Sequence, residues 1–101
     1  MAEAHYLFVD WTNRAVSDSL AIKKYLQKEF SQKEIDHFYK LLESFERIII
    51  SFPKLYPQSI KNKKVRRAVL SKQLSVFYKL AKDHIIVLAV LDNRVGYSKW
   101  P

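Results

Sequence analysis

Residues 65–94, VRRAVLSKQLSVFYKLAKDHIIVLAVLDNR, decide the fold because their hydrophobic pattern has a period of two. The clearest alternation runs over residues 74–80, where apolar and polar side chains fall on opposite sides. One side carries Leu74, Val76, Tyr78 and Leu80, and the other carries Ser75, Phe77 and Lys79. Residues 85–91 are apolar on both faces, as in the central strand of a sheet. We therefore expect strands over 65–70, 74–80 and 85–91, with a short polar hairpin at 82–84.

The preceding segment changes to a helical period. Ser31 and Glu34 have the spacing of a capping box, with Phe30 and Ile35 placed as a hydrophobic staple. The apolar positions that follow are spaced alternately three and four residues apart: Ile35, Phe38, Leu42, Phe45, Ile49 and Phe52. Pro53 disfavours helical geometry at the residue before it. This pattern predicts a helix over 31–52.

An earlier helix is expected over 12–28, capped by Thr12 or Asn13. Its buried stripe is predicted to be Ala15, Ser19, Ile22, Leu26 and Phe30, widened by Val16 and Leu20. Residues 6–11, YLFVDW, predict a first strand. The order is then β-α-α-β-β-β in a single domain over 1–101, an α+β fold. An antiparallel αα-hairpin packs on one face of a mostly antiparallel sheet, and we expect the other face to carry charge.

Positive charge is concentrated in one part of the chain. The net charge is +8, and nine basic residues with no acidic residue lie between Lys54 and Lys82. Such a block can belong to a domain that is merely basic and soluble. More often it marks an anionic partner, either a nucleic acid or an acidic protein segment.

Several kinds of chemistry are not expected. No metal site or cofactor is predicted, because His5, His37 and His84 lie far apart without Cys or acidic partners at metal-ligand spacing. One glycine excludes a glycine-rich phosphate loop, and no carboxylate pair suggests glycosidase or two-metal chemistry. There is no cysteine, no secretory leader pattern, and no apolar run longer than residues 85–91. We expect a cytoplasmic protein without a membrane segment.

The remaining candidate site residues are basic or aromatic. They are Lys63, Lys64, Arg66, Arg67, Lys72, Tyr78, Arg94, Tyr97 and Trp100. Such residues can stabilise a pentavalent phosphate and move a 2′-hydroxyl proton in metal-free RNA cleavage. They can equally bind a partner, or serve as solvated charges that block strand pairing at a sheet edge. Tyr78, in the middle of a strand, is expected in the core.

Taken in order, four segments and a short aromatic tail resemble the RelE/ParE superfamily, the toxins of bacterial type II toxin–antitoxin systems. The segments are YLFVDWTNRAVSDSLAIKKYL (6–26), FPKLYP (52–57), VRRAVLSKQLSVFYKL (65–80) and HIIVLAVLDNR (84–94). The resemblance implies a compact fold like that of microbial ribonucleases. It also implies an antitoxin whose acidic, amphipathic segment wraps the toxin, a role in plasmid stabilisation, and growth inhibition by the free toxin.

The resemblance leaves two activities open. In RelE-type nucleases the second-strand cations correspond to Lys64, Arg66 or Arg67 and the arginine after the last strand to Arg94. The arginine of the third strand falls at Ser75. The terminal tyrosine falls at Trp100, which has no phenol, or with a shift at Tyr97.

The pattern is closer to ParE-like toxins, which act on DNA gyrase without catalysis, and this is the leading expectation. The alternatives are a ribosome-dependent mRNA endoribonuclease using Lys64, Arg66, Arg67, Arg94 and Tyr97, and a basic nucleic-acid-binding module without toxin activity. The residues expected to bind a target or partner are Lys63, Lys64, Arg66, Arg67, Lys72, Arg94 and Trp100.

Overall fold

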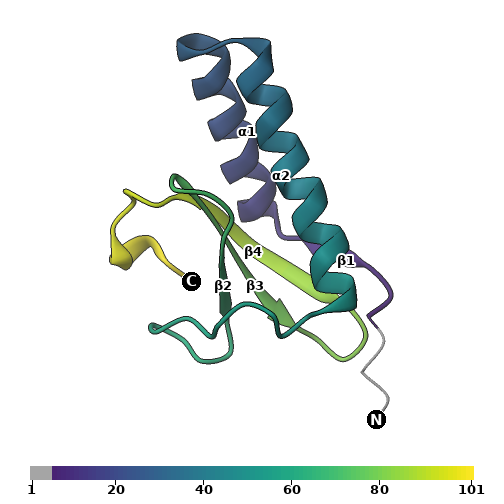
Figure 1. Cartoon of the computed structure of the whole chain (residues 1–101). Coiled ribbons are helices and arrows are strands. Elements are labelled where there is room, and N and C mark those ends of the chain that lie inside the picture. Colours follow the sequence, from purple (N-terminus) through teal and green to yellow (C-terminus); the bar gives the residue numbers. More distant parts are fainter. Residues whose placement is uncertain (1–5) are drawn as a thin grey trace.

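Two helices cover one face of a four-stranded sheet in the computed structural model, which describes residues 6–101 (Figure 1). The elements are β1 (Val9–Trp11), α1 (Asn13–Glu29), α2 (Gln32–Ser51), β2 (Arg66–Val69), β3 (Leu74–Leu80) and β4 (Ile85–Asp92), followed by a 3₁₀ turn at Tyr97–Lys99. The predicted α+β class and β-α-α-β-β-β order are confirmed.

The sheet has the order β1-β4-β3-β2. Strand β1 is parallel to β4, whereas β4 with β3 and β3 with β2 are antiparallel, so the sheet is mostly antiparallel as predicted. Two strands are shorter than expected. Strand β1 begins at Val9 rather than Tyr6, and β2 omits Val65 and Leu70. The Val65 carbonyl accepts from the Ser59 amide, and the Leu70 amide donates to the carbonyl of Leu74, the first residue of β3.

The helix boundaries follow the capping signals. The Thr12 hydroxyl accepts a hydrogen bond from the Ala15 amide at 3.1 Å and caps α1. The capping box at the start of α2 is formed, with the Ser31 amide donating to the Glu34 carboxylate at 3.0 Å. The two helices therefore meet at Phe30 and Ser31 with no intervening loop, which gives the antiparallel hairpin.

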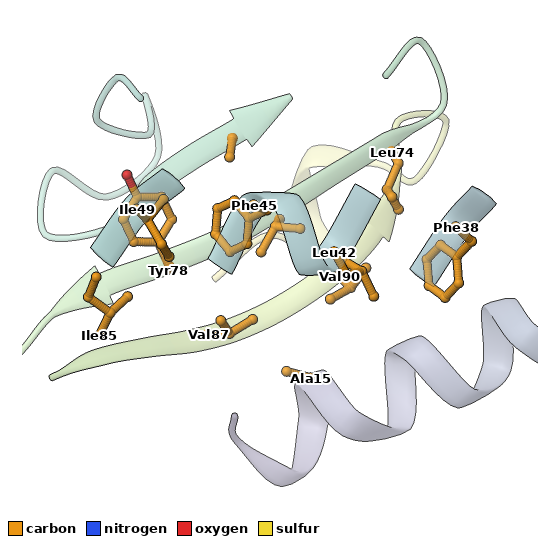
Figure 2. Close-up of a cluster of buried hydrophobic side chains, with 12 residues drawn as sticks. Ala15, Phe38, Leu42, Phe45, Ile49, Leu74, Tyr78, Ile85, Val87 and Val90 are labelled. Atoms are coloured by element: carbon orange, nitrogen blue, oxygen red, sulfur yellow. The ribbon is translucent and has the colours of Figure 1, made fainter. Parts of the chain in front are cut away.

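The main core lies between α2 and the strands (Figure 2). Phe45 and Ile49 of α2 are 1% and 0% exposed, and they lie over Tyr78 of β3 and Ile85 of β4. Tyr78 is in the core, as its position in β3 predicted. The helical stripe and the alternation in β3 therefore point into one cluster.

Four members of the predicted helical stripes are not buried. Phe52 is 63% exposed, Phe30 52%, Leu20 50% and Val16 43%, so the expectation of burial is wrong for them. The molecule measures 47 × 27 × 24 Å along its principal axes, and the hairpin projects past the end of the sheet (Figure 1). A helical period shows which face is apolar, but Phe30 lies at the projecting tip of the hairpin and Phe52 lies at the C-cap where α2 ends.

The face of the sheet away from the helices also differs from the prediction. We expected it to carry charge, but Val65, Phe77, Ala89 and Leu91 form a second buried cluster there. The C-terminal residues Val95 and Trp100 pack against this cluster. The chain covers this face with its own tail.

A bulge in the central strand allows both clusters to form. Phe77 pairs with Ala89 and Tyr78 pairs with Val87, so Leu88 has no partner on β3. The extra residue reverses the alternation along β4. Val87 and Val90 therefore both belong to the main core, while Ala89 belongs to the second cluster.

Beyond the end of β1, backbone groups of β4 form hydrogen bonds with two side chains, that of Thr12 at the N-cap of α1 and that of Asp18 within α1. The Val90 amide donates to the Asp18 carboxylate at 3.0 Å, and the Thr12 hydroxyl donates to the Leu88 carbonyl at 3.2 Å. These contacts replace a strand partner with the edge of α1.

Asp18→Ala is expected to destabilise the fold by about 1–3 kcal/mol, because the buried Val90 amide loses its acceptor. The measurement is urea denaturation followed by circular dichroism. Asp36→Ala removes an exposed carboxylate of α2 that, among the described residues, bonds only to Gln32, and it should change stability by less than about 0.5 kcal/mol. Equal effects of the two substitutions would contradict the role given to Asp18.

Candidate functional site: an apolar groove and divided cations

An apolar groove lies where the hairpin leaves the sheet. It measures about 820 Å³ and lies between the outer halves of α1 and α2, the turn from β2 to β3, and the end of β4. Its apolar lining includes Ile22, Leu26, Phe30, Phe38, Leu41 and Leu74. These side chains belong to the helical stripes and the start of β3, so the groove is the uncovered continuation of the main core.

Charged and polar groups form part of the groove lining. They include Lys72 of the β2–β3 turn and Arg94 after β4, with Glu34, His37 and Asp92. The rings of Tyr25 and Phe30 pack edge to face at the hairpin tip, with their centroids 5.9 Å apart. Both are about half exposed. The groove thus offers apolar area flanked by two cations, a chemistry suited to an amphipathic segment.

Arg94 is held at this groove by its neighbour Asp92. Its Nε donates to Asp92 Oδ1 at 3.0 Å and its Nη2 donates to Oδ2 at 2.8 Å. These hydrogen bonds keep the pKa of Asp92 below its usual value and raise that of Arg94 above its own. The Arg94 side chain is still 79% exposed, so a partner carboxylate or phosphate can reach it.

Arg66 lies elsewhere, beneath the connector that follows α2. Its Nη1 donates to the Tyr56 carbonyl at 2.7 Å and lies 3.5 Å from that of Lys54. Nearby, the Tyr78 hydroxyl donates to the Pro53 carbonyl at 2.8 Å. Arg66 therefore fixes the connector to the sheet, which is a structural use of its charge.

Burial raises the pKa of Tyr78 from 10.0 to about 12, although the Arg66 charge acts in the opposite direction. A phenol whose pKa is raised on folding adds stability that is complete below its unfolded pKa. That stability is lost as the pH rises through the folded value. The fold should therefore weaken between pH 10 and pH 12, and Tyr78→Phe should remove this component. The measurement compares urea denaturation of the two proteins across this range, and parallel pH profiles would contradict it.

Arg67 points to the opposite face of the sheet from Arg66, because successive strand residues alternate. Its guanidinium carbon lies 4.5 Å from the Trp100 ring centroid, and its Nη2 donates to Asn93 Oδ1 at 3.3 Å. Its buried Nε has no hydrogen-bond partner within the described residues. Tyr97 lies beside Trp100, with ring centroids 5.2 Å apart, and is half exposed.

The predicted site residues thus divide among separate surfaces. Lys72 and Arg94 lie at the groove, Arg66 lies under the connector, and Arg67, Tyr97 and Trp100 lie at the tail. Lys63 and Lys64 are exposed in the loop before β2. Hence Arg66, Arg67 and Arg94 do not converge on one point.

Two residues that hold the C-terminal tail were not among the predicted site residues. Lys61 and Arg14 both donate to carbonyls of the C-terminal tail, from positions far away in the chain. Lys61 was counted only as one charge of the basic block, and Arg14 as part of the first helix. Neither stands in a pattern that distinguishes it from other surface cations.

The histidines give no sign of a metal site. His37 lines the groove, whereas His84 stacks on Phe8 with ring centroids 4.8 Å apart. His5 lies outside the described residues. Within residues 6–101 there is no group of three His, Cys, Asp or Glu side chains placed to hold a metal ion. Over the same range, neither helix has the length and apolar character that a membrane crossing requires.

Two comparisons with known proteins find matches to this chain. A family model described as the ParE toxin of the type II toxin–antitoxin system parDE matches residues 9–96. Among solved structures, the chain is similar to the chromosomal ParDE TA system from P. aeruginosa, with a TM-score of 0.73 and 14% identity over 88% of this chain and 98% of that one. It is also similar to the E. coli DinJ–YafQ toxin–antitoxin complex, with a TM-score of 0.53 and 14% identity over 92% and 98%. A comparison with curated proteins finds no match.

At this level of identity the structural likeness shows the fold, and the family model shows the family. The expected RelE/ParE superfamily is confirmed, on its ParE side. With the hairpin-on-sheet fold in place and the match extending over almost every described element, the chain belongs to the ParE toxin family of type II toxin–antitoxin systems.

Proposed function

We propose that this toxin arrests growth when free by binding DNA gyrase, without catalysing a reaction itself. The observation that supports this is the division of the cations. Arg66 bonds to the connector, Arg67 contacts Trp100 and Asn93, and Arg94 is paired with Asp92. RNA cleavage needs a cation and a proton-transfer group within reach of the same phosphate. Binding to a partner protein does not require these groups to meet at one phosphate.

The phenols give further support. The Tyr78 hydroxyl is buried and already donates to Pro53. Trp100 occupies the position where the resemblance to nucleases calls for a tyrosine, and an indole cannot exchange a proton as a phenol does. Tyr97 is half exposed, but its ring packs beside Trp100 at the tail and it does not line the groove with Arg94.

We further propose that the toxin is silenced by a cognate antitoxin whose acidic, amphipathic segment lies in the groove. The apolar side chains of α1 and α2 would cover the apolar face of that segment, and Lys72 and Arg94 would meet its carboxylates. The net charge of +8 favours encounter with an acidic chain, while apolar burial sets how long the complex lasts.

Gyrase inhibition is tested by supercoiling of relaxed plasmid DNA with purified gyrase and increasing amounts of the free toxin. Supercoiling should fall progressively, and preincubation of the toxin with its antitoxin should restore it. Full supercoiling activity at saturating toxin would rule out gyrase as the target.

The second candidate is a ribosome-dependent mRNA endoribonuclease, and the exposure of Arg94 favours it. In this case the toxin should cleave mRNA in a translating extract. Arg94→Ala should abolish cleavage, and Lys82→Ala, in the exposed β3–β4 turn, should retain it. Cleavage without any effect on gyrase would replace the first proposal with this one.

A further inference from the structure

The C-terminal strap, which we define as residues 95–101, packs against the second apolar cluster through Val95 and Trp100. Its backbone hydrogen bonds are local. Lys99 donates to Gly96 at 2.9 Å and Trp100 donates to Tyr97 at 3.0 Å. Within residues 6–101, no backbone hydrogen bond joins residues 96–101 to a strand. Val95, at the start of the strap, donates its amide to the Asp92 carbonyl of β4 at 2.9 Å, so within the described structure it is residues 96–101 that are held by side chains alone.

Cationic side chains make most of these holding contacts. Lys61 Nζ donates to three strap carbonyls, those of Tyr97 at 3.1 Å, Ser98 at 3.3 Å and Trp100 at 2.8 Å. The same ammonium lies 5.3 Å from the Tyr97 ring centroid. From α1, Arg14 donates to the Lys99 carbonyl. Each acceptor is a neutral carbonyl.

Trp100 provides the apolar part of the contact. Its ring lies 5.2 Å from Phe77 and 4.5 Å from the Arg67 guanidinium. Below it lie Val65 and Leu91. Trp100 thus fills an apolar site bordered by a cation whose buried Nε remains unpaired in the described structure.

Few carboxylates lie close to the cations that contact the strap. Among the described residues, neither Lys61 nor Arg67 has a carboxylate within ion-pair distance, and the Arg14 side chain lies 3.8 Å from Asp18. Lys63, Lys64 and Lys99 add exposed positive charge around them. A carboxylate is a stronger acceptor for these donors than a peptide carbonyl.

We propose that the strap is a displaceable occupant of a second interaction surface, and that this surface takes an acidic segment of a partner protein carrying one aromatic or large apolar residue. The carboxylates of the partner would pair with Lys61 and Arg67, which would then no longer contact the strap. The apolar residue of the partner would replace Trp100 over Phe77. This surface is separate from the groove, and the inference stands whether or not gyrase is the target.

An acidic peptide fits this site better than a nucleic acid does. The surface under Trp100 consists of Val65, Phe77 and Leu91, which are buried among one another and need an apolar side chain to cover them. A single strand of nucleic acid instead needs exposed aromatic faces on which successive bases stack. Of the rings at this face, Tyr97 is the one that is half exposed.

The first test removes the competing strap. A chain ending at Val95 is compared with the full chain for binding a fluorescein-labelled, Glu-rich peptide with one central Phe, by fluorescence anisotropy. Because the strap no longer occupies the surface, affinity should rise about 10-fold or more. The same peptide with Gln in place of Glu should bind far more weakly to both chains. Unchanged or weaker binding by the shortened chain, or equal binding of the Gln peptide, would overturn the proposal.

The second test keeps the strap and follows Trp100 directly. The chain has two tryptophans, so Trp11→Phe leaves Trp100 as the sole indole. In this background the Glu-rich peptide should shift Trp100 emission to longer wavelength and increase its quenching by acrylamide. Lys61→Met should cause the same change without peptide, while the matched Lys82→Met control should not. Circular dichroism confirms that each variant is folded.

Two outcomes of the second test count against the proposal. An unchanged Trp100 spectrum in Lys61→Met would show that the cation does not hold the strap. A single-stranded oligonucleotide that displaces Trp100 at lower concentration than the Glu-rich peptide would make the surface a nucleic-acid site instead.

Discussion

Phe45→Ala is expected to cost about 3–5 kcal/mol of folding free energy, the usual range for truncating a buried Phe. Phe45 is 1% exposed, and its ring lies 5.5 Å from that of Tyr78 and 6.1 Å from that of Tyr56. It therefore joins α2, β3 and the connector in one contact. Domains of this size have a total stability of about 5–15 kcal/mol, so the loss leaves a marginal fold. We expect the melting temperature to fall by about 15 °C or more.

The matched control is Phe52→Ala, seven positions further along the same predicted stripe. Phe52 is 63% exposed, so its truncation should change the free energy of unfolding by less than about 1 kcal/mol. Thermal and urea denaturation followed by circular dichroism measure both variants. Similar losses for the two would mean that the hairpin does not pack on the sheet as described.

Tyr25→Glu is expected to weaken antitoxin binding by about 100-fold while leaving the fold intact. Tyr25 lines the groove and is 50% exposed, so the change costs little stability. In the complex it removes an aromatic contact, and it also places a carboxylate against an acidic segment. Aromatic positions at the centre of an interface commonly contribute about 2–4 kcal/mol each.

Tyr39→Glu makes the same chemical change on α2, at a residue that is 39% exposed and does not line the groove. It should leave binding within a few-fold of the original. Isothermal titration calorimetry with the purified antitoxin measures both variants. If Tyr39→Glu lost as much affinity as Tyr25→Glu, the groove would not be the docking site.

The helices and strands could be predicted because local chemistry specifies them. The Ser31–Glu34 capping box fixed the junction of the helices, and the alternation in residues 74–80 fixed both faces of β3. The bulge at Leu88 could not be seen, because residues 85–91 are all apolar and hide the point where the alternation reverses. The groove could not be predicted either, since it depends on how far the hairpin projects past the sheet.

The site residues were harder to place than the fold. Arg66 and Arg67 are both among the residues expected to bind a partner, although adjacent strand residues face opposite sides of a sheet. Their charges therefore cannot act at one point unless the strand is irregular. The contact of Trp100 with Phe77 and Arg67 depends on the return of a short tail, which no periodicity encodes.

Growth after induction shows whether this chain is a toxin that an antitoxin in its groove holds inactive. Expression of the chain alone in a bacterial host should stop growth, and coexpression of the antitoxin should restore it. With Tyr25→Glu, growth should stop whether or not the antitoxin is present. Normal growth of cells that accumulate the soluble, folded chain without antitoxin would contradict the account.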